Sequence, residues 1–122
     1  MANILLVDDD DNFRSMLRIT LQRLGHQISE ASNGLVALKL FQLHLYDVVI
    51  LDLIMPEKEG IETIRDLRKQ RPDVKIIAMF GGGRLKAMDI LSVAKAVGAD
   101  QVLAKPFSND NLLDALNAVT AH

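Results

Sequence analysis

The stretch DVVILDLIMPEKEGIE at residues 47–62 decides the fold. Residues 48–51 form an unbroken run of β-branched and apolar side chains, which is typical of a strand buried on both faces of a sheet. The run ends in the carboxylate of Asp52, and Pro56 and Gly60 indicate a loop after it. Apolar residues then recur at helical spacing, so this stretch predicts a strand, a loop and a helix in succession.

The same alternation continues on both sides of this stretch. Short apolar runs predict four more strands, at 4–7, 27–31, 74–79 and 101–104. Helically spaced apolar residues predict five helices, at 13–24, 35–45, 61–67, 85–96 and 112–119. Strands that alternate with helices imply a parallel sheet covered on both faces. The expected fold class is therefore α/β, with five strands and five helices in a single domain.

The composition argues against several classes of protein. Of the 122 residues, 49% are hydrophobic and 25% are charged, which is ordinary for a globular domain. The 14 basic and 16 acidic residues give a net charge of −2. Nucleic-acid binding by this chain is not expected, because proteins that contact phosphates carry a basic excess. The absence of cysteine rules out disulfides and thiolate zinc sites.

No feature of the sequence predicts an association with membranes. No apolar run approaches the roughly 20 residues that span a bilayer. The chain begins with a short apolar run that leads directly into Asp8 to Asp11, without the basic segment of a signal peptide. We therefore expect a cytoplasmic protein.

Charged side chains follow three of the predicted strands. Asp8 and Asp9 come after the first strand, Asp52 ends the third and Lys105 ends the fifth. Because the carboxyl ends of parallel strands share one edge of the sheet, we expect these four side chains to meet in one cleft. Crowded carboxylates repel one another unless they are protonated or bridged by a cation. A set of oxygen ligands without His or Cys suits Mg²⁺.

Such a cluster has a chemical use. A carboxylate beside a metal ion and a lysine can attack a phosphoryl donor, because the two cations offset the charge of the transferred group. The alternative is that an aspartate after a strand merely caps the next helix or opens a turn. That interpretation suits Asp10 and Asp11 taken singly, but it does not explain charged residues at three separate strand ends.

The sequence resembles the receiver domain of two-component response regulators, the family of the chemotaxis regulator, over essentially its whole length. The matching stretches are ILLVDDDDNFR at 4–14, DVVILDLIMPEKEGIE at 47–62 and GADQVLAKPF at 98–107. The resemblance implies a flavodoxin-like fold with strand order 2-1-3-4-5. It also implies a single receiver domain over residues 1–122, without an effector domain in this chain. Enzyme activity is not expected beyond Mg²⁺-dependent self-phosphorylation from a phosphodonor.

The resemblance assigns roles to the residues at the strand ends. Asp52 would be the phosphoacceptor, and Lys105 would pair with the phosphoryl group and precede a cis peptide bond. The Mg²⁺ ligands would be Asp8, Asp9, Asp52 and the backbone carbonyl of Ile54. The phosphoryl donor would be a phosphohistidine on a sensor histidine kinase or on a phosphotransfer protein.

Two positions depart from the family pattern and alter its switch. The family usually has Ser or Thr at the end of the fourth strand, where this chain has Phe80, and Tyr or Phe in the fifth strand, where it has Val102. In the family, the hydroxyl and the aromatic ring move together on activation. Phe80 has no donor, so it must either crowd the phosphoryl site or turn into apolar surroundings. Our hypothesis is that Phe80 weakens phosphorylation or uncouples it from the change of shape, while Mg²⁺ binding survives.

Three explanations for Phe80 stay open. The chain is a natural receiver with a divergent switch, a degenerate receiver that works without phosphate, or an engineered or selected variant, since Ser to Phe needs one base change.

The resemblance also implies how the domain signals. The expected output is a changed surface on the fourth helix, fifth strand and fifth helix, which binds a downstream protein or a second copy.

Two other functions compete with this one. A phosphorylation-independent interaction domain is favoured by Phe80 and Val102, but the four retained charged residues at the strand ends oppose it. A flavin carrier of similar fold is disfavoured, because four consecutive aspartates would repel the phosphate of the cofactor.

Overall fold

The computed structural model describes residues 2–54, 60–81, 92, 96 and 98–120 of the chain. The strands of this described part are β1 (Asn3–Val7), β2 (Gln27–Ala31), β3 (Val48–Asp52), β4 (Lys75–Gly81) and β5 (Gln101–Lys105). The helices of the same part are α1 (Asp11–Arg23), α2 (Gly34–Leu43), α3 (Gly60–Gln70) and α5 (Asn109–Thr120). The helix expected at 85–96 lies largely outside the described residues.

The five strands form one parallel sheet in the order β2-β1-β3-β4-β5. The chain starts near the middle of the sheet, moves outward to β2, returns past β1 to β3 and continues to β4 and β5. The direction therefore reverses between β1 and β3, and ligands of open α/β sheets bind beyond the strand ends at such a reversal. This topology confirms the predicted α/β fold and its strand order.

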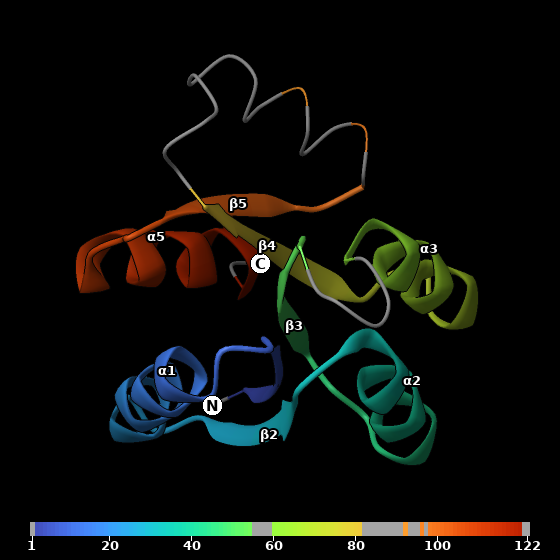
Figure 1. Ribbon diagram of the computed structural model, residues 1–122, viewed down its shortest axis with the longest axis horizontal. Coiled ribbons are helices and arrows are strands. Elements are labelled where there is room, and N and C mark those ends of the chain that lie inside the picture. Colours follow the sequence, from blue (N-terminus) through green and yellow to red (C-terminus); the bar gives the residue numbers. More distant parts are fainter. Residues whose placement is uncertain (1, 55–59, 82–91, 93–95, 97, 121–122) are drawn as a thin grey trace.

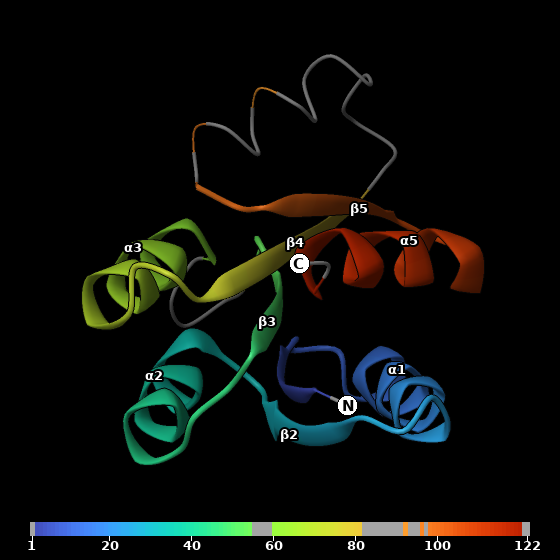
Figure 2. The ribbon, with the colours of Figure 1, turned by 180° about the vertical axis from the view of Figure 1, so that it is seen from behind.

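Helices cover both faces of the sheet. Figure 1 shows α1 and α5 together on one side of the strands and α2 and α3 together on the other. The view from behind in Figure 2 gives the same separation into two layers. None of the helices in the described part of the chain has the length and apolar character needed to cross a membrane.

The inner strands are mainly apolar because each of their faces is covered. Side chains of successive residues in a strand point to opposite faces. In β1, Leu5 and Val7 belong to the core packed against α2 and α3, whereas Ile4 and Leu6 belong to the core packed against α1 and α5. Every residue of β3 is buried. Two cores on one sheet explain why these strands read as unbroken apolar runs.

The acidic segment after β1 leads directly into helix α1. Asp10 is the N-cap of this helix, and its Oδ1 accepts hydrogen bonds from the N–H groups of Asn12 and Phe13, each at 3.1 Å. A carboxylate in this position satisfies free N–H groups and lies at the positive end of the helix dipole. The capping interpretation is therefore correct for Asp10.

Gly60, the first residue of α3, lies against the end of β3. A Cβ atom at this position would lie 2.5 Å from the carbonyl oxygen of Asp52 and 2.5 Å from the Cα of Leu53. The N–H of Gly60 donates to the carbonyl of Leu53 at 2.9 Å. Only glycine permits this close approach, which holds α3 against the strand end that carries Asp52.

Candidate functional site

Three charged residues from different strand ends meet at the carboxyl edge of the sheet. Asp8 follows β1, Asp52 ends β3 and Lys105 ends β5. The Nζ atom of Lys105 lies 2.7 Å from Oδ2 of Asp8 and 2.8 Å from Oδ2 of Asp52. These pairs join residues 97 and 53 positions apart in the sequence. One ammonium group therefore bridges two carboxylates, as the shared edge of a parallel sheet predicts.

Backbone hydrogen bonds orient both carboxylates. Oδ1 of Asp8 accepts from the N–H of Asp10 at 2.9 Å, and Oδ1 of Asp52 accepts from the N–H of Ile54 at 3.0 Å. Asp8 is completely buried, whereas the side chain of Asp52 remains 12% exposed. Buried carboxylates need such partners, because an unpaired buried charge is strongly unfavourable. Each group thus presents its Oδ2 atom to Lys105.

The electrostatic surroundings keep Lys105 protonated. Burial lowers the pKa of this ammonium group, but the hydrogen bonds and charges of Asp52 and Asp8 outweigh that effect and raise the pKa above its ordinary value. The amine is therefore a positive charge fixed between two negative ones at neutral pH. A group of this kind can pair with a phosphoryl oxygen that arrives at the same place.

The acidic cluster has the donor set of a magnesium site. Asp8, Asp9 and Asp52 each offer a carboxylate oxygen, and these atoms lie within 4.8 Å of one another. The resemblance to receiver domains implies an acidic Mg²⁺ pocket of this kind. Within the described part of the chain, Lys105 pairs with Asp8 and Asp52, and the third carboxylate, that of Asp9, is exposed to solvent. Mg²⁺ prefers oxygen ligands and keeps several waters, which an open cluster of carboxylates allows.

Ile54 lies beside this cluster. Its N–H donates to Asp52, and its side chain is 74% exposed. The expected role of its carbonyl oxygen as a metal ligand stays a prediction. The expected cis peptide bond between Lys105 and Pro106 is present.

Phe80 lies in the core on the α2 and α3 side of the sheet. The residue is 2% exposed, and Val102 and Ala104 of β5 pack against the same core. Its strand neighbour Met79 belongs to the opposite core, together with Leu103. The ring is expected either to crowd the phosphoryl site or to turn into apolar surroundings, and in the structure it lies in apolar surroundings. Near the end of β4 the chain thus has a buried ring at the position where the resemblance leads us to expect a hydroxyl.

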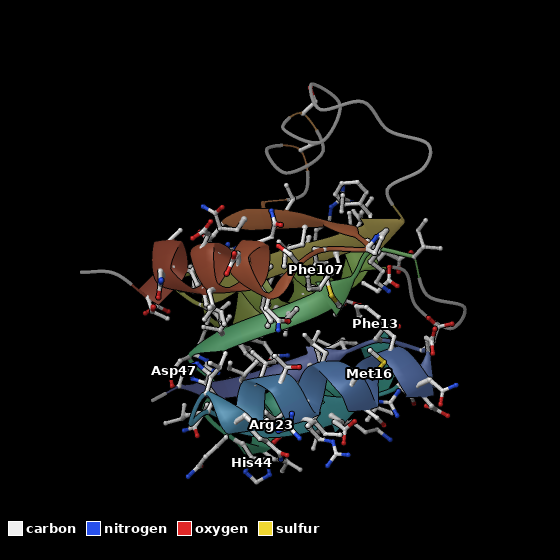
Figure 3. All side chains as sticks on the ribbon, turned by 90° about the vertical axis from the view of Figure 1, so that its left-hand side faces the viewer. Phe13, Met16, Arg23, His44, Asp47 and Phe107 are labelled. Carbon is white, nitrogen blue, oxygen red and sulfur yellow. The ribbon has the colours of Figure 1, made fainter. Side chains whose placement is uncertain are left out.

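Sequence reasoning missed an aromatic pair next to Lys105. Nζ of Lys105 lies 4.3 Å from the centre of the Phe13 ring. The rings of Phe13 and Phe107 meet edge to face, with centres 5.9 Å apart, and Figure 3 shows them near one another at the same end of α1 and α5. The helical spacing of Phe13 indicated a core position and gave no sign of a contact with a residue so distant in sequence.

Arg14 is a second residue that sequence reasoning missed. Its Nη1 donates to the carbonyl of Asp8 at 2.6 Å, and its other nitrogens pair with Asp11 at 2.7 Å and with Glu30 at 3.1 Å. The guanidinium thereby ties the acidic segment to α1 and to the edge strand β2. Its signal in the sequence is weak, because one arginine on an amphipathic helix is usually a solvated charge.

Comparison with known proteins defines the class of this chain. The sequence profile of the response regulator receiver domain matches residues 4–117. The chain therefore belongs to the receiver domains of response regulators, the signalling domains of two-component systems.

Individual relatives support this assignment over the whole domain. The chemotaxis protein CheY of Thermotoga maritima is 35% identical over 118 residues, which are 96% of this chain and 96% of that protein. The sporulation initiation phosphotransferase F of Bacillus subtilis is 34% identical over 93% of this chain and 89% of its own length. Among solved structures, the chemotaxis protein CheY4 of Vibrio cholerae matches with a TM-score of 0.87 and 34% identity over 98% of both chains.

Other relatives are considerably longer. The chain spans 41% of the probable transcriptional regulator ycf27 of Cyanidium caldarium, at 37% identity, and 27% of the transcriptional regulatory protein ZraR of Klebsiella oxytoca, at 32% identity. The same domain thus occurs in relatives both as nearly the whole chain and as one part of a longer protein.

Proposed function

We propose that this chain accepts a phosphoryl group on Asp52 from a phosphohistidine of a sensor histidine kinase or phosphotransfer protein. The observation that carries the proposal is the ammonium of Lys105, which lies 2.7 Å and 2.8 Å from the oxygens of two carboxylates on different strands. The reaction needs Mg²⁺, and Asp8, Asp9, Asp52 and the Ile54 carbonyl would hold it. The domain itself has no other enzymatic activity.

Accessibility favours Asp52 over Asp8 as the acceptor. Asp8 is completely enclosed and cannot reach a donor, whereas the side chain of Asp52 is 12% exposed beside Lys105. In the transfer, an oxygen of Asp52 forms a bond to phosphorus while the bond from phosphorus to the donor nitrogen breaks. That nitrogen keeps the electron pair. The ammonium of Lys105 offsets the charge of the phosphoryl oxygens, and a bound Mg²⁺ would supply further positive charge.

The direct test is chemical phosphorylation followed by mass spectrometry. The protein is incubated with Mg²⁺ and phosphoramidate, and its intact mass is compared with that of Asp52→Asn. A phosphoryl adduct that the variant lacks is the expected result. An adduct of equal yield in the variant would assign the acceptor to another residue and overturn the proposal.

We further propose that Phe80 weakens phosphorylation or separates it from the change of shape, while Mg²⁺ binding survives. The support is the burial of the ring in the core of α2 and α3, where it offers no hydrogen bond to a phosphoryl oxygen. An adduct that forms only after Phe80→Ser would mean that this ring keeps the domain silent. The proposal fails if Phe80→Ser changes neither the yield nor the response.

The second candidate function is a protein-interaction domain that works without phosphate. The packing of Phe80, Val102 and Ala104 in one core favours it, because it leaves no polar switch on β4 or β5. Absence of an adduct both in this chain and in Phe80→Ser would support this function. In either case, the expected contact surface includes the 85–96 helix, which lies largely outside the described residues.

A further inference from the structure

Lys105 makes a third contact that does not involve a carboxylate. Besides its bonds to Asp8 and Asp52, its Nζ atom lies 4.3 Å from the centre of the Phe13 ring. The face of an aromatic ring carries partial negative charge and attracts an ammonium at this distance. The ammonium is therefore held from two sides, by charge and by the face of a ring.

The position of the Phe13 ring is itself constrained. The N–H of Phe13 donates to the cap residue Asp10, so the first turn of α1 is fixed where the ring leaves it. The ring of Phe107 meets it at 84°, and both rings pack against the core under α1 and α5. Figure 3 shows the two rings between the ends of these helices. The face that meets Lys105 is thus held in place before any ligand arrives.

The two kinds of contact respond differently to a second cation. A cation that takes the oxygens of Asp8 and Asp52 competes with Lys105 for them, and like charges then repel the ammonium. The attraction of the ring does not depend on those oxygens. We propose that Phe13 is a positioning residue, whose ring keeps the Lys105 ammonium at the edge of the carboxylate pair, where it can meet a phosphoryl group. The kinetic consequence of this inference rests on the function proposed above.

The first test uses the metal-free protein and no phosphodonor. In NMR spectra, the methylene protons next to Nζ of Lys105 should shift upfield, because they lie near the face of the Phe13 ring. The shift should disappear in Phe13→Leu and persist in Phe13→Tyr, which keeps an aromatic face. Equal Lys105 resonances in the three proteins would overturn the proposal.

The second test separates ring charge from ring shape. Phenylalanine analogues with one, two and three fluorine atoms at position 13 weaken the negative face while changing the shape little. The rate of phosphorylation by phosphoramidate with Mg²⁺ should fall stepwise through the series, by roughly two- to fivefold in total. Phe13→Tyr should retain the rate. If the phosphorylation rate stays constant through the fluorinated series, the ring only fills space and the proposal is overturned. This holds even if Phe13→Leu is phosphorylated slowly.

Failure of this inference can be distinguished from failure of the proposed function. Asp52→Asn tests only which residue is the acceptor. The phosphorylation rates of the Phe13 variants are interpreted only once Asp52→Asn is shown to form no phosphoryl adduct. If the unaltered chain takes up no phosphoryl group, the proposed function fails, and the Lys105 resonances alone decide whether Phe13 holds the ammonium.

Discussion

Lys105 is the residue on which the candidate site depends. Its ammonium pairs with two carboxylates that the fold brings together, one of which is completely buried. Removal of one partner from a buried cluster of charges lowers stability by more than the ion pair itself contributes. The reason is that the remaining charges stay buried without compensation. The same argument predicts that an added cation can take over part of its role.

Lys105→Met is therefore expected to lower the free energy of unfolding by about 3 kcal/mol. Addition of Mg²⁺ should restore more stability to this variant than to the unaltered chain, because the ion meets carboxylates without an ammonium between them. Urea unfolding with and without Mg²⁺ measures both effects. A variant as stable as the unaltered chain without metal would contradict the expectation.

His26 gives a second prediction at this scale. Its Nδ1 accepts the N–H of Ala2 at 3.1 Å, and burial lowers its pKa below the ordinary value of 6.5. Below that value the unfolded chain binds a proton more readily than the folded one. The contribution of neutral His26 to the stability of the folded state is therefore complete above about pH 6.5. It is lost as the pH falls toward the lower pKa that His26 has in the folded state.

Urea unfolding at about pH 7.5 and pH 5.5 measures this effect. The stability lost between these two conditions should be smaller in His26→Gln than in the unaltered chain, because glutamine does not titrate. His44→Gln is the matched control and should lose as much stability between the two conditions as the unaltered chain does. An identical loss in the unaltered chain and in His26→Gln would refute the assignment to His26.

At the scale of elements, the junction of β3 and α3 determines where Asp52 lies. Gly60 lets the helix begin against the backbone of Asp52 and Leu53, closer than any side chain would permit. Because β3 is buried on both faces, its end cannot move outward to relieve a clash. The helix must shift instead, and its contact with the backbone of Asp52 and Leu53 shifts with it.

Gly60→Ala should accordingly lower stability by about 2 kcal/mol or more and reduce phosphorylation of Asp52. Gly81→Ala is the matched control, since a Cβ at Gly81 meets nothing within 4 Å. Thermal unfolding and intact mass after phosphoramidate treatment are the measurements. Similar losses in both variants would show that the close approach is not the cause.

At the scale of the whole molecule, the question is whether a change at Asp52 reaches the far side of the sheet. Phe80 and Val102 belong to the core of α2 and α3, so β4 and β5 are joined there by apolar packing. Apolar side chains form no hydrogen bond with a phosphoryl oxygen, so phosphorylation of Asp52 gives this packing no new contact. A ligand shifts a conformational equilibrium only through contacts that differ between the two states.

We therefore expect phosphorylation to alter backbone NMR signals near Asp52, Lys105 and Asp8 while leaving most of β5 unchanged. In Phe80→Ser the altered signals should extend along β4 and β5. That variant should also lose about 3 kcal/mol of stability, because it leaves a cavity in the core. Changes along β5 of equal extent in both proteins would contradict this account.

Much of the fold was predictable because it depends on local patterns. Burial on two faces leaves unbroken apolar runs in β1 and β3, and helical spacing is visible in the sequence of α1. The strand order came from the resemblance to a family, since no local pattern encodes which strands are neighbours. The predicted meeting of Asp8, Asp52 and Lys105 followed from parallel strands, whose carboxyl ends lie at one edge.

The sequence by itself determined the alternation of strands and helices, the acidic and basic residues at the strand ends and the cap at Asp10, because each depends on near neighbours in the chain. Only the tertiary structure decided that Lys105 bridges two carboxylates, that Phe13 lies beneath its ammonium and that Phe80 turns into the core. These contacts join residues far apart in sequence. They depend on strand register and on the packing of two helical layers, which no local pattern specifies.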